Sequence, residues 1–155
     1  MTSDEIKKMI FFDEGVRLDV YLCPAKKLTV GAGHNIEADP ARHILHSLKL
    51  GDKITPEQAQ ALYEYDINRV INNLVTKIPG YSTFQEKYKI VLINMAFNLG
   101  INGLLQFKNM LQAMRTDNDI QVIQEIKNSK YYKDVTNRAN RMISIINNII
   151  PDVYK

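Results

Sequence analysis

The chain has 155 residues, 45% of them hydrophobic and 24% charged, a composition typical of a folded domain rather than of a disordered chain. It contains no run of about 18 apolar residues, which a membrane-spanning helix would need, and no signal-peptide pattern at its N-terminus. A single cysteine, Cys23, excludes an internal disulfide, and three scattered histidines without ligand spacing argue against a metal site.

Charge is unevenly distributed along the chain. Residues 1–85 contain ten Lys/Arg and eleven Asp/Glu, a net of −1, whereas residues 86–155 contain ten and six, a net of +4. A basic C-terminal half favours an anionic polymer such as nucleic acid or cell wall, but a solvated helical face explains the same charges equally well. Nucleic acid is disfavoured because no zinc-finger, phosphate-loop or RNA-binding aromatic motif is present.

The first third of the chain predicts a helix followed by a small sheet. Apolar residues at helical spacing predict a short first helix that Gly15 ends. Residues 16–36 combine β-branched and aromatic residues with alternate glycines, which predicts a small antiparallel sheet with a hairpin at 24–27. A further helical stretch is predicted at 39–50, opened by an Asp-Pro pair.

The rest of the chain is predicted to be helical. Thr55-Pro56-Glu57-Gln58 is a capping box that starts a long helix at about 56–78, which Pro79-Gly80 ends. Residues 84–99 are apolar nearly all round, which is typical of a buried core helix, and Gly100 and Gly103 are expected to break it. Three shorter helices follow at about 104–114, 118–128 and 137–150.

This layout predicts one α+β domain over residues 1–155 with two lobes. A small sheet-containing lobe is expected at about 13–60, and a helical lobe is formed by about 80–155 with the N-terminal helix. The helix at 56–78 connects the lobes. A cleft between lobes is a common ligand site.

Glu14 is the first candidate for chemistry. It ends the predicted first helix, directly before Gly15, where the helix dipole disfavours a carboxylate and should raise its pKa. A carboxylic acid that keeps its proton near neutral pH suits general acid catalysis of glycosidic bond cleavage. An exposed glutamate at a helix end is the ordinary alternative, and position alone favours it.

Thr29, Gly31 and Gly33 alternate along the predicted strand, so they are expected to share one face. Two glycines on one face would leave a strip of bare backbone along which a sugar polymer could lie. A bulge or tight packing is the alternative explanation for either glycine alone.

The spacing of Glu14, eight residues, Cys23, five residues and Thr29 resembles the Glu–Asp/Cys–Thr triad of the phage-type lysozymes. The segment 29–34, Thr-Val-Gly-Ala-Gly-His, is similar to that family's Thr-x-Gly-x-Gly-His segment. Blocks at 93–100 and 136–141 are also similar, so the resemblance covers essentially the whole domain. It implies a lysozyme-like two-lobed fold and muramidase activity.

The resemblance also implies roles for individual residues. Glu14 would donate a proton to the leaving glycosidic oxygen, and Arg138 would pair with it, lowering its pKa and opposing the helix effect. His34 and Asp66 match a structural ion pair, although a catalytic histidine is an alternative. The resemblance further implies a catalytic Thr29, which would position water or substrate, and a substrate-binding Phe97, for which an ordinary core phenylalanine is the alternative. Gly31 and Gly33 are the substrate-binding residues of the predicted strand face.

Cys23 departs from the best-known members of that family, which have aspartate at this position. Other members resemble this chain in having Cys-Pro-Ala here. The thiol could act as a base, act as a nucleophile or only shape the site. A small buried hydrophobe is the plainest alternative.

Together these observations predict an endolysin-type muramidase that cleaves the β-1,4 bond between N-acetylmuramic acid and N-acetylglucosamine in peptidoglycan without a cofactor. The resemblance to endolysins implies synthesis in a host cytoplasm and access to the wall through a separate holin-like membrane-permeabilising protein. A monomer is expected because no sustained heptad is present. We expect neither a nucleic-acid partner nor stable insertion into a membrane.

A catalytically degenerate lysozyme fold that binds glycan or a protein partner is the competing hypothesis. Cys23 permits this reading because the usual aspartate is missing. Glu14, Thr29 and Arg138 argue against it, since a binding module would not require that trio. Clearing of a cell-wall suspension distinguishes the two hypotheses.

Overall fold

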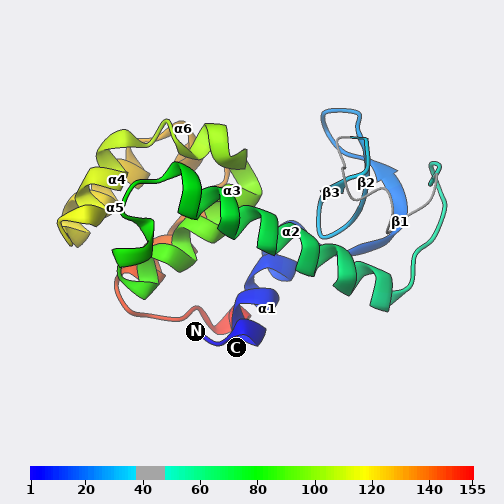
Figure 1. Ribbon diagram of the computed structural model, residues 1–155, viewed down its shortest axis with the longest axis horizontal. Coiled ribbons are helices and arrows are strands. Elements are labelled where there is room, and N and C mark those ends of the chain that lie inside the picture. The colour runs from blue at the N-terminus through cyan, green and yellow to red at the C-terminus, as the bar shows by residue number, and fades with distance from the viewer. Residues whose placement is uncertain (38–47) are drawn as a thin grey trace. The chain divides into compact units, whose positions relative to one another are not determined.

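The computed structural model describes residues 1–37 and 48–155, and the predicted helix at 39–50 lies largely outside them. The chain forms two compact units, the larger made of Met1–Met9 with Val70–Lys155 and the smaller of Ile10–Arg69. The predicted α+β class is confirmed, because a small antiparallel sheet lies in the smaller unit and the larger unit is helical (Figure 1).

The predicted first helix and hairpin are confirmed. Helix α1 (Ser3–Glu14) ends at Gly15, whose φ of 69° is readily adopted only by glycine. Strands β1 (Arg17–Leu22), β2 (Leu28–Gly31) and β3 (His34–Asn35) follow and pair antiparallel in that order. The sheet therefore begins two residues after the glycine that ends α1.

Helix α2 (Pro56–Lys77) begins with the predicted capping box. Thr55 Oγ1 accepts from the Gln58 backbone N–H at 3.1 Å, and Gln58 Oε1 accepts from the Thr55 backbone N–H at 2.8 Å. The first turns of α2 pack on the sheet, where each buried aliphatic side chain contributes about 1.5–3 kcal/mol. The apolar cluster of the smaller unit consists of Val20, Val30, Ile54, Ala59 and Leu62.

Helix α3 (Glu86–Leu104) is the core helix of the larger unit, as predicted from its apolar sequence. Ile90 to Ala96 are all buried. Gly100, with φ 72° and ψ 164°, breaks the helix as expected. The second break expected at Gly103 is wrong: this glycine stays helical, and a Cβ atom there would lie only 3.2 Å from Leu99 Cβ. Gly103 therefore serves close packing rather than helix termination.

The remaining helices partly match the prediction. The observed elements are η1 (Tyr81–Thr83), α4 (Lys108–Arg115), α5 (Asp119–Lys127), α6 (Lys130–Asp134), α7 (Thr136–Ile146) and η2 (Asp152–Tyr154). Helix α6 was not predicted, and α7 ends at Ile146 rather than near residue 150. Asn148 adopts a φ of 62°, and the Ile149 N–H donates to the Ser144 carbonyl at 2.8 Å, which closes the helix early.

Over the described residues no single helix is long and apolar enough to cross a membrane. Among these residues, only α3 and α4 taken together, as a sharply bent pair, have the length and apolar composition of a membrane span.

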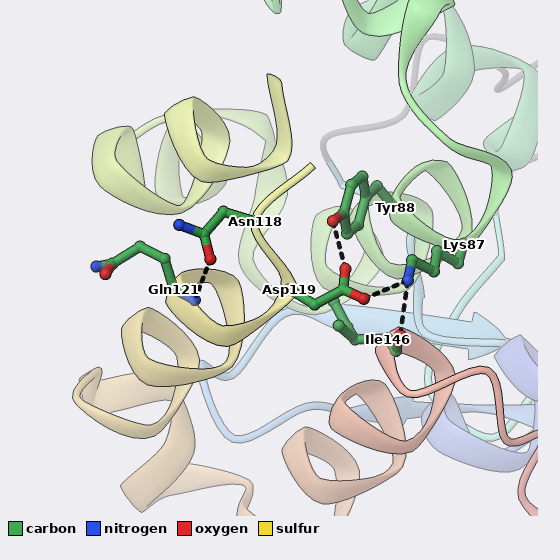
Figure 2. A network of polar contacts seen from close by, with 6 residues as sticks. All are labelled: Lys87, Tyr88, Asn118, Asp119, Gln121 and Ile146. Atoms are coloured by element: carbon green, nitrogen blue, oxygen red, sulfur yellow. Dashed lines mark hydrogen bonds and ion pairs between the residues drawn. The ribbon is translucent and has the colours of Figure 1, made fainter. Parts of the chain in front are cut away.

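A polar network joins α3, the start of α5 and the end of α7 (Figure 2). Lys87 Nζ donates to Asp119 Oδ2 at 2.6 Å and to the Ile146 carbonyl at 2.9 Å, and the Tyr88 hydroxyl donates to Asp119. Burial alone would raise the pKa of Asp119, but the hydrogen bonds from Lys87 and Tyr88 outweigh it and lower the pKa. The network therefore links three helices through one carboxylate.

Candidate active site

Glu14 is the last residue of α1, and its half-buried side chain lies against Gly33. A Cβ atom at Gly33 would lie 3.1 Å from Glu14 Oε2, closer than an ordinary van der Waals contact. Glycine at this position therefore lets the carboxyl group approach the turn between β2 and β3 without the shift that a larger residue would require. The last turn of α1 is anchored by Phe11, whose ring packs edge-on against Tyr63 of α2 with centroids 5.2 Å apart.

The prediction that Thr29, Gly31 and Gly33 share one face of a strand is wrong. Strand β2 ends at Gly31, and both glycines have positive φ, 65° and 72°, so the chain turns where alternation would have continued. A Cβ atom at Gly31 would lie 3.7 Å from Leu62 Cδ1, in the apolar cluster. The backbone beside the Glu14 carboxyl group is therefore a glycine turn rather than a strand face.

The hairpin between β1 and β2 brings Cys23 next to Thr29. The Cys23 N–H donates to the Lys27 carbonyl at 3.0 Å, and the Thr29 hydroxyl donates to the same carbonyl at 2.8 Å. Thr29 is buried, with only 3% of its surface exposed. The Lys27 backbone N–H lowers the pKa of the Cys23 thiol, as does the Thr29 hydroxyl when it turns toward the sulfur, against the opposing effect of burial. The site thus holds a partly exposed free thiol with thiolate character above that of an ordinary cysteine.

His34 and Asp66 link β3 to α2. His34 Nδ1 lies 2.6 Å from Asp66 Oδ2, and both residues are buried. Arg69 Nη2 lies 3.7 Å from the other carboxylate oxygen of Asp66. Because Gly33 directly precedes His34, this contact fixes the end of the turn against which Glu14 packs.

Arg138 lies in the larger unit, in the first turn of α7. Its side chain is buried against Asn94 of α3: Nε donates to Asn94 Oδ1 at 2.8 Å and Nη2 donates to the Asn94 carbonyl at 3.0 Å. Two hydrogen bonds to one residue fix the plane of the guanidinium group. Phe97, half-buried, lies one helical turn after Asn94 on α3.

The predicted site residues thus fall into two sets. The smaller unit brings together Glu14 with Gly33, and Cys23 with Thr29, whereas Phe97 belongs to the larger unit, as does Arg138. Asn94 was not assigned a role from the sequence, because its complete burial and its hydrogen bonds with Arg138 appear only in the structure. Among the residues that the structure describes, no group of three or more His, Cys, Asp or Glu side chains is placed to hold a metal ion.

A small antiparallel sheet, a helical unit and a helix-terminal glutamate beside a glycine turn define a lysozyme-like protein. A family model described as Phage lysozyme matches residues 12–141. The chain is 31% identical over 167 residues to "Probable T4-type lysozyme 1" of Dictyostelium discoideum, covering 97% of this chain and 98% of that protein. It is 30% identical over 156 residues to "Probable T4-type lysozyme 2" of the same organism, covering 90% and 92%.

A further similarity is to "Endolysin" of Acyrthosiphon pisum secondary endosymbiont phage 1, 38% identical over 90 residues, which cover 58% of this chain and 53% of that protein. The chain belongs to the phage lysozyme family. The resemblance seen in the sequence is therefore confirmed. Membership indicates a lysozyme-type glycosidase.

Proposed function

We propose that this protein is a muramidase that hydrolyses the β-1,4 bond between N-acetylmuramic acid and N-acetylglucosamine in peptidoglycan, with Glu14 as the general acid. The observation that carries the proposal is the placement of the Glu14 carboxyl group. It stands at the end of α1, half-buried, against a turn where a Cβ atom at Gly33 would crowd it at 3.1 Å. A fixed carboxyl group beside bare backbone suits protonation of a glycosidic oxygen.

In the proposed reaction the proton of Glu14 moves to the glycosidic oxygen as the bond from that oxygen to the anomeric carbon breaks. On its opposite side the anomeric carbon then accepts either water, whose proton passes to the Cys23 thiolate, or the Cys23 sulfur. In the second case a water molecule that gives its proton to the Glu14 carboxylate later displaces the sulfur from the anomeric carbon. Because the pKa of the Cys23 thiol is lowered, more of it is available as thiolate to take a proton from water or to attack carbon. Inversion at the anomeric carbon would identify a base and retention a nucleophile.

Thr29 has a place in either route. Its hydroxyl carries one proton, which it donates to the Lys27 carbonyl at 2.8 Å while the thiol is neutral and can turn to the sulfur when the thiol ionises. In either orientation the lone pairs of the hydroxyl oxygen can accept a hydrogen bond from a water molecule beside the sugar. The role of Arg138 as the partner of the catalytic glutamate stays a prediction from the family resemblance.

The similarity to the phage endolysin described above supports peptidoglycan as the substrate. The net charge of +4 over residues 86–155 favours adhesion to an anionic wall, and such adhesion weakens with salt. We extend the proposal to an enzyme made in a host cytoplasm that reaches the wall after a separate protein opens the membrane.

Product analysis tests the proposal directly. Purified peptidoglycan is digested, the new reducing ends are reduced with borohydride and the fragments are identified by mass spectrometry. A muramidase yields reduced muramic acid at these ends. Reduced glucosamine ends would contradict the assigned bond, and binding without soluble fragments would favour the degenerate lysozyme fold.

A further inference from the structure

Tyr21 occupies a position in β1 that the proposed chemistry leaves unused. Tyr21 and Thr29 are Cα partners in the antiparallel pair of β1 and β2, so their side chains lie on the same face of the sheet. The neighbouring Val20 points to the opposite face, into the apolar cluster with Val30. Tyr21 therefore stands on the side of the sheet that carries the candidate chemistry, not in the apolar core of the smaller unit.

The Tyr21 ring is held in place from one side. The Arg17 guanidinium lies over it at 4.2 Å from the ring centroid. Arg17 is in turn fixed by Asp19, with Nε donating to Oδ1 at 3.2 Å and Nη2 to Oδ2 at 2.6 Å. A side chain already confined in this way loses little conformational entropy when a ligand binds to it.

The surroundings of the phenol are charged. Burial raises the pKa of Tyr21, and the negative charges of Cys23, Glu14 and Asp19 raise it further, against the opposing effect of Arg17. The hydroxyl group is therefore protonated throughout the physiological range and can both donate and accept a hydrogen bond. Among the charges that act on the phenol are those of Glu14 and Cys23, the two residues proposed to act on the glycosidic bond.

From this geometry we infer that Tyr21 is a substrate-binding residue, whose hydroxyl group hydrogen-bonds to the N-acetylated sugar between Glu14 and Cys23. The inference rests on the proposed function for the identity of the sugar. A positioned phenol supplies one neutral hydrogen bond to the sugar. Loss of the hydroxyl group should therefore weaken binding about fivefold. The ring supplies apolar contact area that a phenylalanine would keep.

The test compares two tyrosines that differ mainly in position. Tyr65 of α2 is also half-buried in the smaller unit and has the Arg69 guanidinium 5.9 Å from its ring centroid, so Tyr65→Phe is a matched control. Both substitutions are made in a Glu14→Gln protein that cannot turn over. Binding of a soluble N-acetylglucosamine–N-acetylmuramic acid tetrasaccharide is measured by calorimetry, and folding is followed by thermal unfolding.

We expect Tyr21→Phe to raise the Kd of the tetrasaccharide about fivefold with little change in Tm, and Tyr65→Phe to leave the Kd unchanged. In the active protein, Tyr21→Phe should raise KM more than it lowers kcat. Equal Kd values for the two variants, or no binding by the Glu14→Gln parent, would overturn the inference. Failure of the wild-type protein to cleave peptidoglycan would overturn the proposed function alone, because the binding comparison does not require turnover.

Discussion

Replacing Gly33 with alanine separates the placement of the Glu14 carboxyl group from the stability of the fold. Gly33 is exposed and has a φ of 72°, a conformation that costs other residues about 1–2 kcal/mol. For a chain of this size such a cost lowers Tm by roughly 2–8 °C. The new methyl group would also lie 3.1 Å from Glu14 Oε2, so the carboxyl group would have to move by a few tenths of an ångström.

A displacement of this size matters because general acid catalysis depends on the position of the proton donor. A misplacement of 1 Å costs about a hundredfold in rate, so a shift of a few tenths of an ångström should cost Gly33→Ala roughly four- to tenfold of its activity. The assay is the rate at which purified peptidoglycan is solubilised, measured well below the Tm of the variant. Thermal unfolding of the same preparation reports the stability loss.

Gly51 provides the matched control in the same unit. It is also exposed, with a φ of 86°, but a Cβ atom there would meet nothing within 4 Å. Gly51→Ala should therefore lose a similar amount of stability and keep its activity. If Gly33→Ala proved as active as Gly51→Ala, the contact between Gly33 and Glu14 would have no part in catalysis and the reasoning would be refuted.

Two further predictions follow from the altered pKa values. The rate at which iodoacetamide alkylates Cys23 should rise with pH through a midpoint below about 8.5, the value of an ordinary thiol. Thr29→Val should raise this midpoint, because it removes the hydroxyl that lowers the pKa of the thiol. An unchanged midpoint in Thr29→Val would exclude a contact between the hydroxyl and the sulfur. Because the pKa of Asp119 is lowered on folding, its stabilisation is complete above about pH 3.9 and is lost as the pH falls through the lower folded value. Urea unfolding should show this loss, and Asp119→Asn should remove part of the slope; an unchanged slope would mean that the bonds from Lys87 and Tyr88 do not depend on the charge.

The elements predicted correctly are those in which local chemistry decides the conformation. Thr55 and Gln58 exchange side-chain-to-backbone hydrogen bonds that start α2. Gly15 ends α1 with a positive φ, a conformation that glycine adopts without support from tertiary contacts. Helix α6 has only five residues, too few for a periodic pattern. The early end of α7 depends on Asn148 adopting a left-handed conformation, which asparagine adopts in some contexts and not in others.

The site was predictable as a set of residues but not as an arrangement. Motif spacing identifies Glu14 and Cys23. The residue at which β2 ends, however, depends on how β2 pairs with β3, so Gly33, predicted on a strand face, lies in a turn in the structure. The role of Asn94 depends on Arg138, 44 residues away in the sequence. Such a contact is made by the packing of α3 and α7, for which neither helix alone carries a signal.

The most direct test of the account is the peptidoglycan-solubilising rate of Glu14→Gln, compared with that of Glu64→Gln, which alters an exposed glutamate of α2. General acid catalysis supplies about 10²–10⁴ in rate. We predict that Glu14→Gln loses at least about a hundredfold while its thermal unfolding stays close to that of the wild type, and that Glu64→Gln keeps full activity. A folded Glu14→Gln protein with activity within a few-fold of the wild type would contradict the central claim.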